Sequence, residues 1–579
     1  MTGTVILQRS QAPHWLYFQQ SLEIISTTDP AQVYPLLNQI EEKVNRDHLY
    51  AAGFIAYEAA SAFDPAMQVH SSAPLPLLWF GLYHSPVERH APPAAQNTHT
   101  ISDWQPVTDK THYRQAIEYI KTCIGRGETY QVNYTIRLRA NFNGSPLNLF
   151  GTLIASQRSD YAAYIDTGST VICSASPELF FQRDGTTLTS KPMKGTTTRG
   201  KTLAEDEQQH SWLYNSPKNR AENVMIVDMI RNDMGRIAQA GSIQVPQLFT
   251  VERYPTVLQM TSTVTAQTQA TTTEIMAALF PCASITGAPK VRTMALINQL
   301  EPEPRGIYTG SIGYIAPNQQ AQFNVAIRTV SIDKRSSLAE YGVGGGVVWD
   351  SISEQEYAEC YLKARVLKEA RPHFDLLETL LWTPDLGYFL CEEHLHRLRD
   401  SAHYFNIPFD YAQLLNRLET LAATFDQPHR VRLLIDPNGE ITTQTVPFDP
   451  TLSQKPWRVT LASEPVDSND RFLYHKTTHR QVYSDAKAAR PGFDDVILWN
   501  EHGQITEATI ANVVIQRDDK LLTPPLECGL LAGTFRAALL AQQKIHEQII
   551  TVDDLKRSDR LYLINSVRKW IEAVYVSEQ

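Results

Sequence analysis

Helical and strand periodicities alternate along the whole chain, with no repeat or low-complexity tract between them. In the run 109–125, apolar residues recur at helical spacing: Tyr113, Ile117, Ile120 and Ile124. In the run 131–140, apolar and polar residues alternate strictly, which predicts a strand with one buried face. The pattern therefore indicates a protein that contains both helices and strands.

The clearest interruption of this pattern follows the helical run KARVLKEA. There Arg371-Pro372 ends the helix, and a new apolar run, FDLLETLLW, begins directly afterwards. A chain of 579 residues is also too long for one ordinary hydrophobic core. We therefore predict two domains, 1–370 and 371–579.

Composition narrows the class of protein. With 42% hydrophobic and 20% charged residues the chain has a globular composition, and its net charge of −10 argues against a nucleic-acid-binding protein. The apolar run near the start is too short for a signal peptide, and no segment approaches the roughly 18 uncharged apolar residues of a membrane span. The six cysteines are far apart, which indicates free thiols rather than structural zinc or disulfides. A cytoplasmic protein is expected.

Candidate chemistry begins in the stretch KPMKGTTTRG, where Lys194 precedes a glycine at which the chain must turn. Upstream, Asp184-Gly185 between two β-prone runs predicts a two-residue hairpin loop, with Glu178 opposite Lys191. Glu178 and Lys194 would then gather at the open end of one hairpin. A carboxyl group and an amine held together there can act as general acid and nucleophile, or they can simply form a cross-strand ion pair.

Three further carboxylates are candidates for binding a cation. Glu222 opens the helical run AENVMIVDMIRNDMGRIA, and Glu356 and Glu359 share one face of the helical run SISEQEYAECYLKARVL. Three carboxylates suit Mg²⁺, which prefers oxygen ligands. The alternative is structural, since Ser353 and Glu356 have the spacing of a capping box and Glu359 could be solvated.

Two other features could bind an anion. Arg328 lies in the alternating run FNVAIRTVSI, so its side chain projects either into a cleft or at an exposed sheet edge. The glycines Gly344, Gly345 and Gly346 can present backbone N–H groups to an anion, although a bulge or a turn would use them equally well.

Taken together, these segments resemble the chorismate-utilising enzymes over roughly residues 104–370. The motifs that carry the resemblance occur in family order: GETYQVNYT, SPELF, KPMKGT, AENVMIVDMIRNDMGR, SITGAPKVR, GIYTGSIGYI, AIRTV, GGGVVWDS and EQEYAE. Anthranilate synthases usually carry alanine at the position of Lys194, and the lysine form is similar to component I of the aminodeoxychorismate synthases. The resemblance implies an α+β fold, with a β-sandwich core and flanking helices.

The resemblance also implies roles for the candidate residues. Lys194 would add to C2 of chorismate while Glu178 protonates the departing C4 hydroxyl, after which ammonia attacks C4. Mg²⁺ would be held by Glu222, Glu356 and Glu359. The carboxylates of chorismate would be bound by Tyr308, Arg328 and the backbone of Gly344, Gly345 and Gly346. Gln259 stands where many relatives have histidine, so no role is carried over to it.

The run 374–579 resembles the two-lobed fold-type IV pyridoxal-phosphate enzymes. Its motifs are LCEEHLHRLRDSAHYF, FLYHKTTHR, QITEATIANVVI and LLAGTFRAALL, each of which alone could be a surface or turn segment. The resemblance implies that Lys476 forms the Schiff base with pyridoxal phosphate and that Glu507 keeps the pyridine nitrogen protonated. The phosphate would be bound at a helix start by Arg397, Thr534, Phe535 and Ser566.

Within fold type IV the chain is most similar to the aminodeoxychorismate lyases, and a homodimer through this domain is compatible with the resemblance. Both domains together imply an enzyme that aminates chorismate at C4 and then eliminates pyruvate to give 4-aminobenzoate for folate synthesis. The alternatives are an anthranilate-type synthase fused to an amino acid transaminase, and a non-catalytic scaffold. No cysteine lies in the Gly-x-Cys-x-Gly context of a glutamine amidotransferase, so a separate amidotransferase subunit is expected to supply ammonia.

Overall fold

In a computed structural model of the full chain, the described residues are 3–10, 14–71, 75–93, 98–157, 159–364, 367, 372–449 and 455–577. The chain divides into two compact units. The first comprises Met1–Thr198 and His210–Arg371, and the second comprises Arg199–Gln209 and Pro372–Gln579. The eleven residues Arg199–Gln209 lie within the first of the two predicted domains in sequence, but they group with the second unit.

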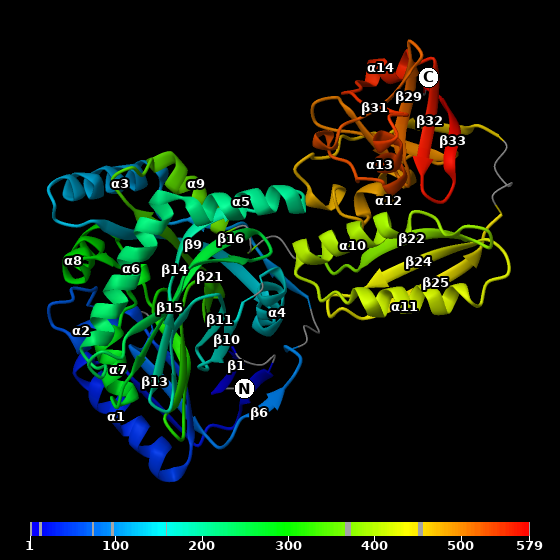
Figure 1. The fold of residues 1–579 in the computed structure, drawn as a ribbon. Helices are drawn as coiled ribbons and strands as arrows, with labels where there is room; N and C mark the ends of the chain where they lie inside the picture. Colours follow the sequence, from blue (N-terminus) through cyan, green and yellow to red (C-terminus); the bar gives the residue numbers. More distant parts are fainter. Residues whose placement is uncertain are drawn as a thin grey trace. The chain divides into compact units, whose positions relative to one another are not determined.

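The first unit contains two large antiparallel sheets (Figure 1). One sheet has the spatial order β17 (Gly287–Ala288), β9 (Gln131–Gly144), β21 (Leu338–Val347), β20 (Thr329–Asp333), β11 (Thr170–Ser176), β10 (Tyr161–Asp166), β1 (Thr4–Arg9), β2 (His14–Phe18) and β6 (Val87–Arg89), with β7 (His99–Ile101) and β8 (Gln105–Pro106) also paired to β9. The other has the order β14 (Met193–Thr198), β16 (Val257–Gln267), β13 (Thr187–Lys191), β12 (Leu179–Asp184), β19 (Gln320–Val325), β18 (Ser311–Ala316), β4 (Tyr50–Ile55), β5 (Leu78–Tyr83) and β3 (Glu23–Thr27), with β15 (Gln244–Arg253) paired to β16.

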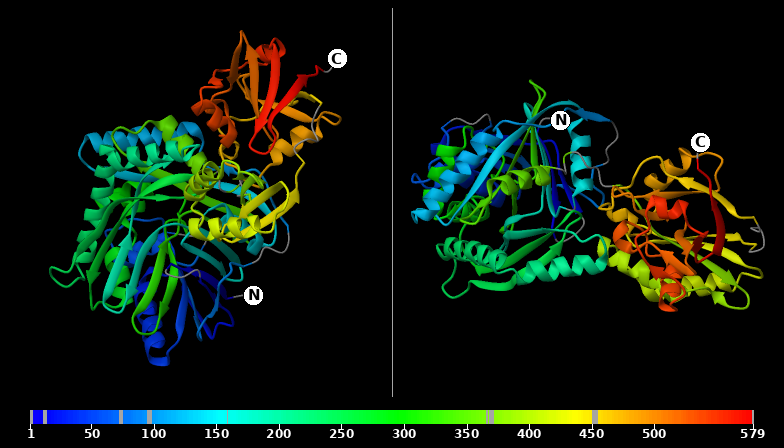
Figure 2. Two further views of the ribbon diagram at one scale, coloured as in Figure 1. Left: turned by 45° about the vertical axis from the view of Figure 1, so that its right-hand side comes forward. Right: turned by 90° about the horizontal axis from the view of Figure 1, so that it is seen from above.

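The two sheets form a sandwich with helices on both outer faces. Val5 and Leu16 of the first sheet share one buried cluster with Phe54 and Trp79 of the second, so this cluster lies between the sheets. Figure 2 gives two further views of the layers. The helices up to residue 364 are α1 (Pro30–Asp47), α2 (Ala60–Phe63), α3 (Lys110–Gly125), α4 (Pro146–Ser156), α5 (Leu203–Asn215), α6 (Pro217–Gly235), α7 (Thr272–Leu279), α8 (Lys290–Leu300) and α9 (Ser353–Ala364). Helices α1, α6 and α7 pack on the second sheet and α3, α4 and α9 on the first, which confirms the predicted sandwich with flanking helices.

Local sequence accounts for where the helices begin. Asp109 caps α3, because its side chain accepts a hydrogen bond from the backbone N–H of His112, and the predicted helix 109–125 is confirmed. Ser216 caps α6 in the same way and Pro217 occupies its first position, where a missing N–H costs nothing.

Two strand predictions need correction. Both faces of β9 are buried along most of its length, because its polar residues face the interior rather than solvent. The run FNVAIRTVSI is not one strand, since β19 ends at Val325 and β20, which belongs to the other sheet, begins at Thr329. Arg328 lies in this crossover with a φ of 52°, a left-handed conformation that interrupts the regular alternation.

The predicted hairpin forms with a shifted register. Its loop begins at Gly185, one residue later than predicted, because glycine takes the left-handed turn position and Asp184 remains paired. An irregularity further along then places Leu179, rather than Glu178, opposite Lys191. Glu178 thus lies just beyond the paired strands.

The second unit has two lobes, and its described residues build two sheets. The first lobe combines β23 (Gly387–Tyr388), β22 (Leu376–Thr383), β24 (His429–Ile435) and β25 (Ile441–Pro447) with α10 (Cys391–Phe405) and α11 (Tyr411–Ala422). The second has the strand order β28 (Ile505–Ala508), β27 (Asp495–Trp499), β26 (Trp457–Leu461), β33 (Lys569–Tyr575), β32 (Arg560–Asn565), β29 (Asn512–Arg517), β30 (Lys520–Thr523) and β31 (His546–Glu547), with α12 (Gln481–Ala488), α13 (Thr534–Ala541) and α14 (Val552–Lys556). An additional pairing of β28 with β29 closes part of this sheet on itself.

The inserted segment Arg199–Gln209 is hydrogen-bonded within the second unit. The hydroxyl of Tyr404 in α10 donates to the carbonyl of Gly200 over 2.6 Å, and Nε2 of His475 donates to the carbonyl of Lys201 over 3.1 Å. Tyr404 and His475 are both buried. The segment therefore covers part of the surface around α10 and the chain just before Lys476.

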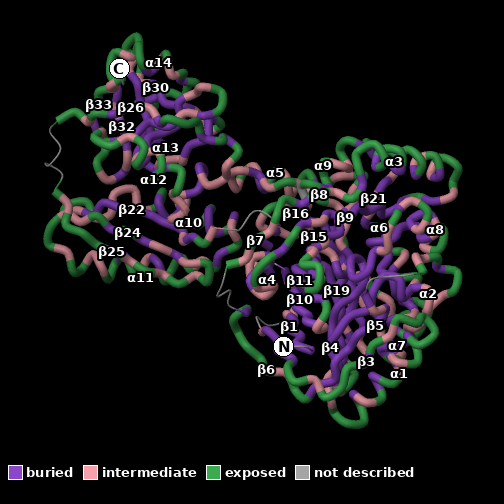
Figure 3. Tube along the Cα trace, turned by 180° about the vertical axis from the view of Figure 1, so that it is seen from behind, coloured by how far each residue is buried: buried purple, intermediate pink, exposed green. Residues whose placement is uncertain are grey.

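Burial follows the strands, as Figure 3 shows for both units. All six cysteines are free thiols, and five of them are buried, as predicted. In the described part of the chain, no helix combines the length and the apolar character that crossing a membrane requires.

Two candidate active sites

Lys194 and Glu178 lie in the first unit at the same end of the predicted hairpin. Lys194 is on β14, and Glu178, which is 2% exposed, directly precedes β12. The Glu178 oxygen Oε1 is buried and has no hydrogen-bond partner within the described part of the structure. Burial raises the pKa of Glu178 to about 7, although Ser284 and Lys194 act against that rise. Burial lowers the pKa of Lys194, against the attraction of Glu222 and Glu178.

Glycines allow the backbone to approach this lysine closely. Gly195 has a φ of 95°, and a Cβ there would lie 3.1 Å from the Cβ of Asn219 in α6. A Cβ on Gly346 of β21 would lie 2.3 Å from Nε2 of Gln131 and 3.1 Å from Nζ of Lys194. The amine of Lys194 is therefore placed against the backbone of β21, and no larger residue fits between them.

The three predicted metal ligands lie on two helices around the same strand. Glu222 is in α6, and Glu356 and Glu359 are one turn apart in α9. Oε2 of Glu356 and Oε1 of Glu359 lie 3.1 and 4.0 Å from the position that a Cβ on Gly345 would take. Carboxylate oxygens suit Mg²⁺. Within the described ranges, however, no three His, Cys, Asp or Glu side chains are grouped closely enough to hold a metal ion.

Neighbouring groups hold the two α9 carboxylates instead. The hydroxyl of Ser351 donates to Glu356 over 2.6 Å. Lys363 pairs with Glu359 at 2.7 Å and also donates to the carbonyl of Gly344 over 2.8 Å. Although partial burial opposes it, this ammonium lowers the pKa of Glu359, whose side chain remains 46% exposed. Burial raises the pKa of Glu356, so of these two carboxylates only that of Glu359 is shifted toward the ionised form.

The predicted chorismate-binding residues take different positions. Tyr308 is buried, and its ring packs so closely on Gly342 that a Cβ there would lie 2.2 Å from the ring. Gly344 pairs with Thr135 of β9, whose N–H is bonded to Glu301, so the backbone of Gly344 faces away from β9. Half-buried Arg328 donates a short hydrogen bond to Gln157, and burial lowers its pKa.

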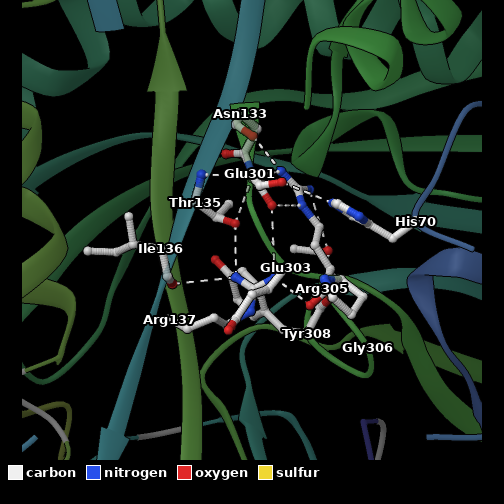
Figure 4. Close-up of polar contacts among 12 residues, drawn as sticks. His70, Asn133, Thr135, Ile136, Arg137, Glu301, Glu303, Arg305, Gly306 and Tyr308 are labelled. Carbon is white, nitrogen blue, oxygen red and sulfur yellow. Dashed lines mark hydrogen bonds and ion pairs between the residues drawn. The ribbon is translucent and has the colours of Figure 1, made fainter. Parts of the chain in front are cut away.

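A network of buried polar side chains lies beside Tyr308 (Figure 4). The carboxylate of Glu301 accepts hydrogen bonds from the backbone N–H of Thr135 and from the guanidinium of Arg305. Arg137 lies with its guanidinium carbon 5.2 Å from the centre of the Tyr308 ring and donates to the hydroxyl of Thr135. The polar face of β9 thereby fixes groups beside the site, and sequence alternation alone assigned that face to solvent.

The second unit contains a pocket of about 370 Å³ that gathers the residues predicted to bind pyridoxal phosphate. Lys476 and Glu507 both line it. Burial and the nearby guanidinium of Arg397 lower the pKa of Lys476 to about 8. Burial raises the pKa of Glu507 to about 7, although its carboxylate accepts hydrogen bonds from the hydroxyl of Tyr483 and the N–H of Leu531.

The predicted phosphate-binding groups surround the same pocket. Its lining includes Arg397, Thr534, Phe535 and Ser566, and Thr534 begins α13. Arg397 uses Nε and Nη2 to bind Glu378 and Nη1 to bind a backbone carbonyl. A guanidinium has five N–H donors, so two remain for a phosphate. An amine, a buried carboxyl group and a helix start beside the two remaining N–H donors of Arg397 fit pyridoxal phosphate.

Sequence reasoning missed the groups that hold these residues in place. Glu378 is fully buried in β22, where it accepts hydrogen bonds from Arg397 over 2.8 and 2.7 Å and from Nδ1 of His394 over 2.6 Å. Tyr483 donates to Glu507 over 2.7 Å. The signal for Glu378 was available, because it is the one acid within the apolar run LLETLLW, and an acid buried in such a run requires a partner.

Known protein families match the two parts of the chain separately. Residues 3–369 match the family described as chorismate binding enzyme, and residues 375–574 match the family described as amino-transferase class IV. Among solved structures, anthranilate synthase component I from Streptococcus pneumoniae TIGR4 superposes with a TM-score of 0.55 at 22% identity. It covers 64% of this chain and 93% of its own, which shows a shared fold for the first unit.

Curated relatives are similar over part of the chain. Aminodeoxychorismate synthase component 1 of Bacillus subtilis is 40% identical over 260 residues, or 45% of this chain and 55% of the relative. Its Escherichia coli counterpart is 40% identical over 271 residues, or 46% and 59%. The chain thus spans just over half the length of these relatives. Because the first family match covers more than half of the chain, the protein belongs to the chorismate binding enzyme family.

Proposed function

We propose that the protein makes 4-aminobenzoate in two steps, using chorismate and ammonia in the first unit and the resulting aminodeoxychorismate in the second. The observation that carries the first step is the placement of half-buried Lys194 and buried Glu178 at the same end of one hairpin. Burial favours the neutral form of each, and a neutral amine and a neutral carboxylic acid are the forms that nucleophilic and general acid catalysis require.

In the first step the amine of Lys194 adds to C2 of chorismate, and both ring double bonds shift as the C4 hydroxyl leaves. Glu178 supplies the proton with which this hydroxyl departs as water. Ammonia then attacks C4, both double bonds shift back, and Lys194 is released. Tyr308, Arg328 and the β21 glycines would bind the substrate carboxylates. Glu222, Glu356 and Glu359 would hold Mg²⁺ only if their carboxylates moved closer together than they lie in this structure.

The second step would release pyruvate from aminodeoxychorismate. When bound, pyridoxal phosphate supplies an electron sink next to the C4 amine. Lys476 would remove the C4 proton, and a pKa of about 8 leaves part of this amine neutral near pH 7. Glu507 would orient the ring nitrogen, and Arg397, Thr534, Phe535 and Ser566 would hold the phosphate.

The proposal extends to partners and location. Relatives named component 1 support a separate glutamine amidotransferase subunit that delivers ammonia. We further propose that the protein works in the cytoplasm and pairs as a homodimer through its second unit.

Product identity tests the proposed function. Purified protein is incubated with chorismate, an ammonium salt, Mg²⁺ and pyridoxal phosphate, and the products are separated by chromatography. The expected products are 4-aminobenzoate and pyruvate in equal amounts. Formation of 2-aminobenzoate would instead support the anthranilate-type alternative, and no turnover of chorismate would support a non-catalytic scaffold.

A further inference from the structure

One wall of the pocket in the second unit carries arginines that the proposed chemistry does not use. Arg430 and Arg432 lie two residues apart on β24, so both side chains leave the same face of the strand. The residues Val431 and Leu433 face the other way and are fully buried. Both arginines line the pocket, together with Gln444, which pairs with Arg432 across the sheet.

A third arginine lines the same pocket from the other lobe. Arg568 lies in the turn between β32 and β33. Its guanidinium carbon is 5.5 Å from the ring centre of Phe448 and 5.6 Å from that of Trp457. Stacking on aromatic rings restrains a guanidinium while leaving the N–H donors at its edge available to a ligand.

The charges in this pocket do not balance. Six arginines line it, namely Arg397, Arg430, Arg432, Arg480, Arg536 and Arg568, against the single carboxylate of Glu507. Arg397 is paired with Glu378, and Arg536 with Glu547. In the described part of the chain, no carboxylate forms an ion pair with Arg430, Arg432 or Arg568. Like charges gathered in a pocket repel one another, and an anionic ligand relieves that repulsion.

These three arginines also lie outside the immediate surroundings of Lys476. The carbonyl of Lys476 accepts a hydrogen bond from the backbone N–H of Leu377 at the start of β22. Arg432 and Arg430 pair with positions further along β22, Thr379 and Leu381, and Ser566, two residues before Arg568, donates to the carbonyl of Thr379. The pocket thus has an inner cationic region next to the amine and an outer one along β24. An anionic group bound at the outer region must be separated from the reacting amine by the body of the ligand.

We propose that Arg430, Arg432 and Arg568 form an outer anion site that binds carboxylate groups of the substrate, apart from the inner phosphate site. The proposal rests on the function proposed above. In aminodeoxychorismate the ring carboxylate lies across the ring from the C4 amine, and a second carboxylate lies on the enolpyruvyl group. An α-amino acid carries its carboxylate on the same carbon as the amine. The outer site therefore selects cyclic dicarboxylates over simple amino acids.

Steady-state kinetics with aminodeoxychorismate test the site. Arg430→Gln and Arg432→Gln are each expected to raise KM at least about tenfold with little change in kcat, because each removes a charge-assisted hydrogen bond. Arg417→Gln is the matched control, since Arg417 is an exposed arginine of α11 in the same lobe that does not line the pocket. An unchanged KM in the double variant Arg430→Gln/Arg432→Gln would overturn the proposal.

Calorimetric binding separates the site from the proposed reaction. The holoenzyme is expected to bind isophthalate (benzene-1,3-dicarboxylate) at least about tenfold more tightly than benzoate, and the double variant should lose this preference. If wild-type protein releases no pyruvate from aminodeoxychorismate yet keeps the preference, the reaction assignment fails and the dicarboxylate site stands. If both ligands bind equally to the wild type and the double variant, the site is refuted even where pyruvate is released.

Discussion

Burial shifts the pKa values of Glu178 and Lys194 in opposite directions. The pKa of the acid rises and that of the base falls, so the same dry environment moves both groups toward neutrality. A surface ion pair would behave in the reverse way, since each charge would stabilise the other. The pKa shifts therefore favour a reactive pair over the cross-strand ion pair that the sequence left open.

Lys194→Ala is expected to lower amination of chorismate by at least about 10³-fold, because no other amine replaces the nucleophile. The variant should still release pyruvate from supplied aminodeoxychorismate, since Lys194 lies in the other unit. Both rates are measured on the same preparation by chromatography of the products. Wild-type formation of aminodeoxychorismate by this variant would contradict the nucleophile role.

Glu178 should make stability depend on pH. Its folded pKa of about 7 lies above the ordinary value of roughly 4.3, so protonation stabilises the native state below pH ~4 and this contribution is lost as pH rises through 7. Wild-type protein should therefore lose up to ~3 kcal/mol relative to Glu178→Gln between pH 5 and pH 8. Unfolding midpoints of the first unit, measured for both proteins across that range, check this. A constant difference would show that Glu178 is ionised throughout.

At the scale of secondary structure, the first site depends on the close approach of β21 to its neighbours. Gly346→Ala would place a methyl group 2.3 Å from Gln131 and 3.1 Å from Nζ of Lys194. Amination should fall more than about tenfold, because the amine must move away from its position. Gly235→Ala at the end of α6 is the control, since its nearest neighbour would be 3.9 Å away. Equal rates for the two variants would contradict the packing argument.

Sequence patterns predicted most elements, because those depend on local periodicity, and they named candidate residues that the structure places together at two locations. They did not predict the crossover at Arg328, since two strands of different sheets read as one continuous alternation. They also misjudged β9, because a polar face can point at an interior site as easily as at solvent. Contacts such as Glu378 with Arg397 join residues that only the tertiary fold brings together.

For the molecule as a whole, two sites that act in sequence mean that substitutions in each site should affect different reaction steps. Lys476→Ala should leave amination intact and cause aminodeoxychorismate to accumulate from chorismate, because only the second step needs this amine. The variant should also fail to attach pyridoxal phosphate covalently on borohydride reduction, which mass spectrometry detects. Continued release of 4-aminobenzoate at the wild-type rate would assign the second step to another residue.

The nitrogen donor provides a further test at this scale. None of the six cysteines lies in a Gly-x-Cys-x-Gly context, so the purified chain should use ammonium salts and not glutamine. The ammonia-dependent rate should rise with pH as free ammonia increases, until Glu178 loses its proton. Ammonia-free glutamine as the sole donor is compared with ammonium chloride. Efficient use of glutamine by this chain alone would reveal an amidotransferase site within it.

The segment Arg199–Gln209 limits how the two halves can be exchanged. The chain passes between the two units after Thr198, after Gln209 and after Arg371, so a single cut does not separate them. A fragment beginning at Pro372 would leave the hydroxyl of Tyr404 without its acceptor on Gly200, and the imidazole of His475 without its acceptor on Lys201. To join the second unit of this protein to the first unit of another protein, two stretches of sequence must therefore be transferred rather than one.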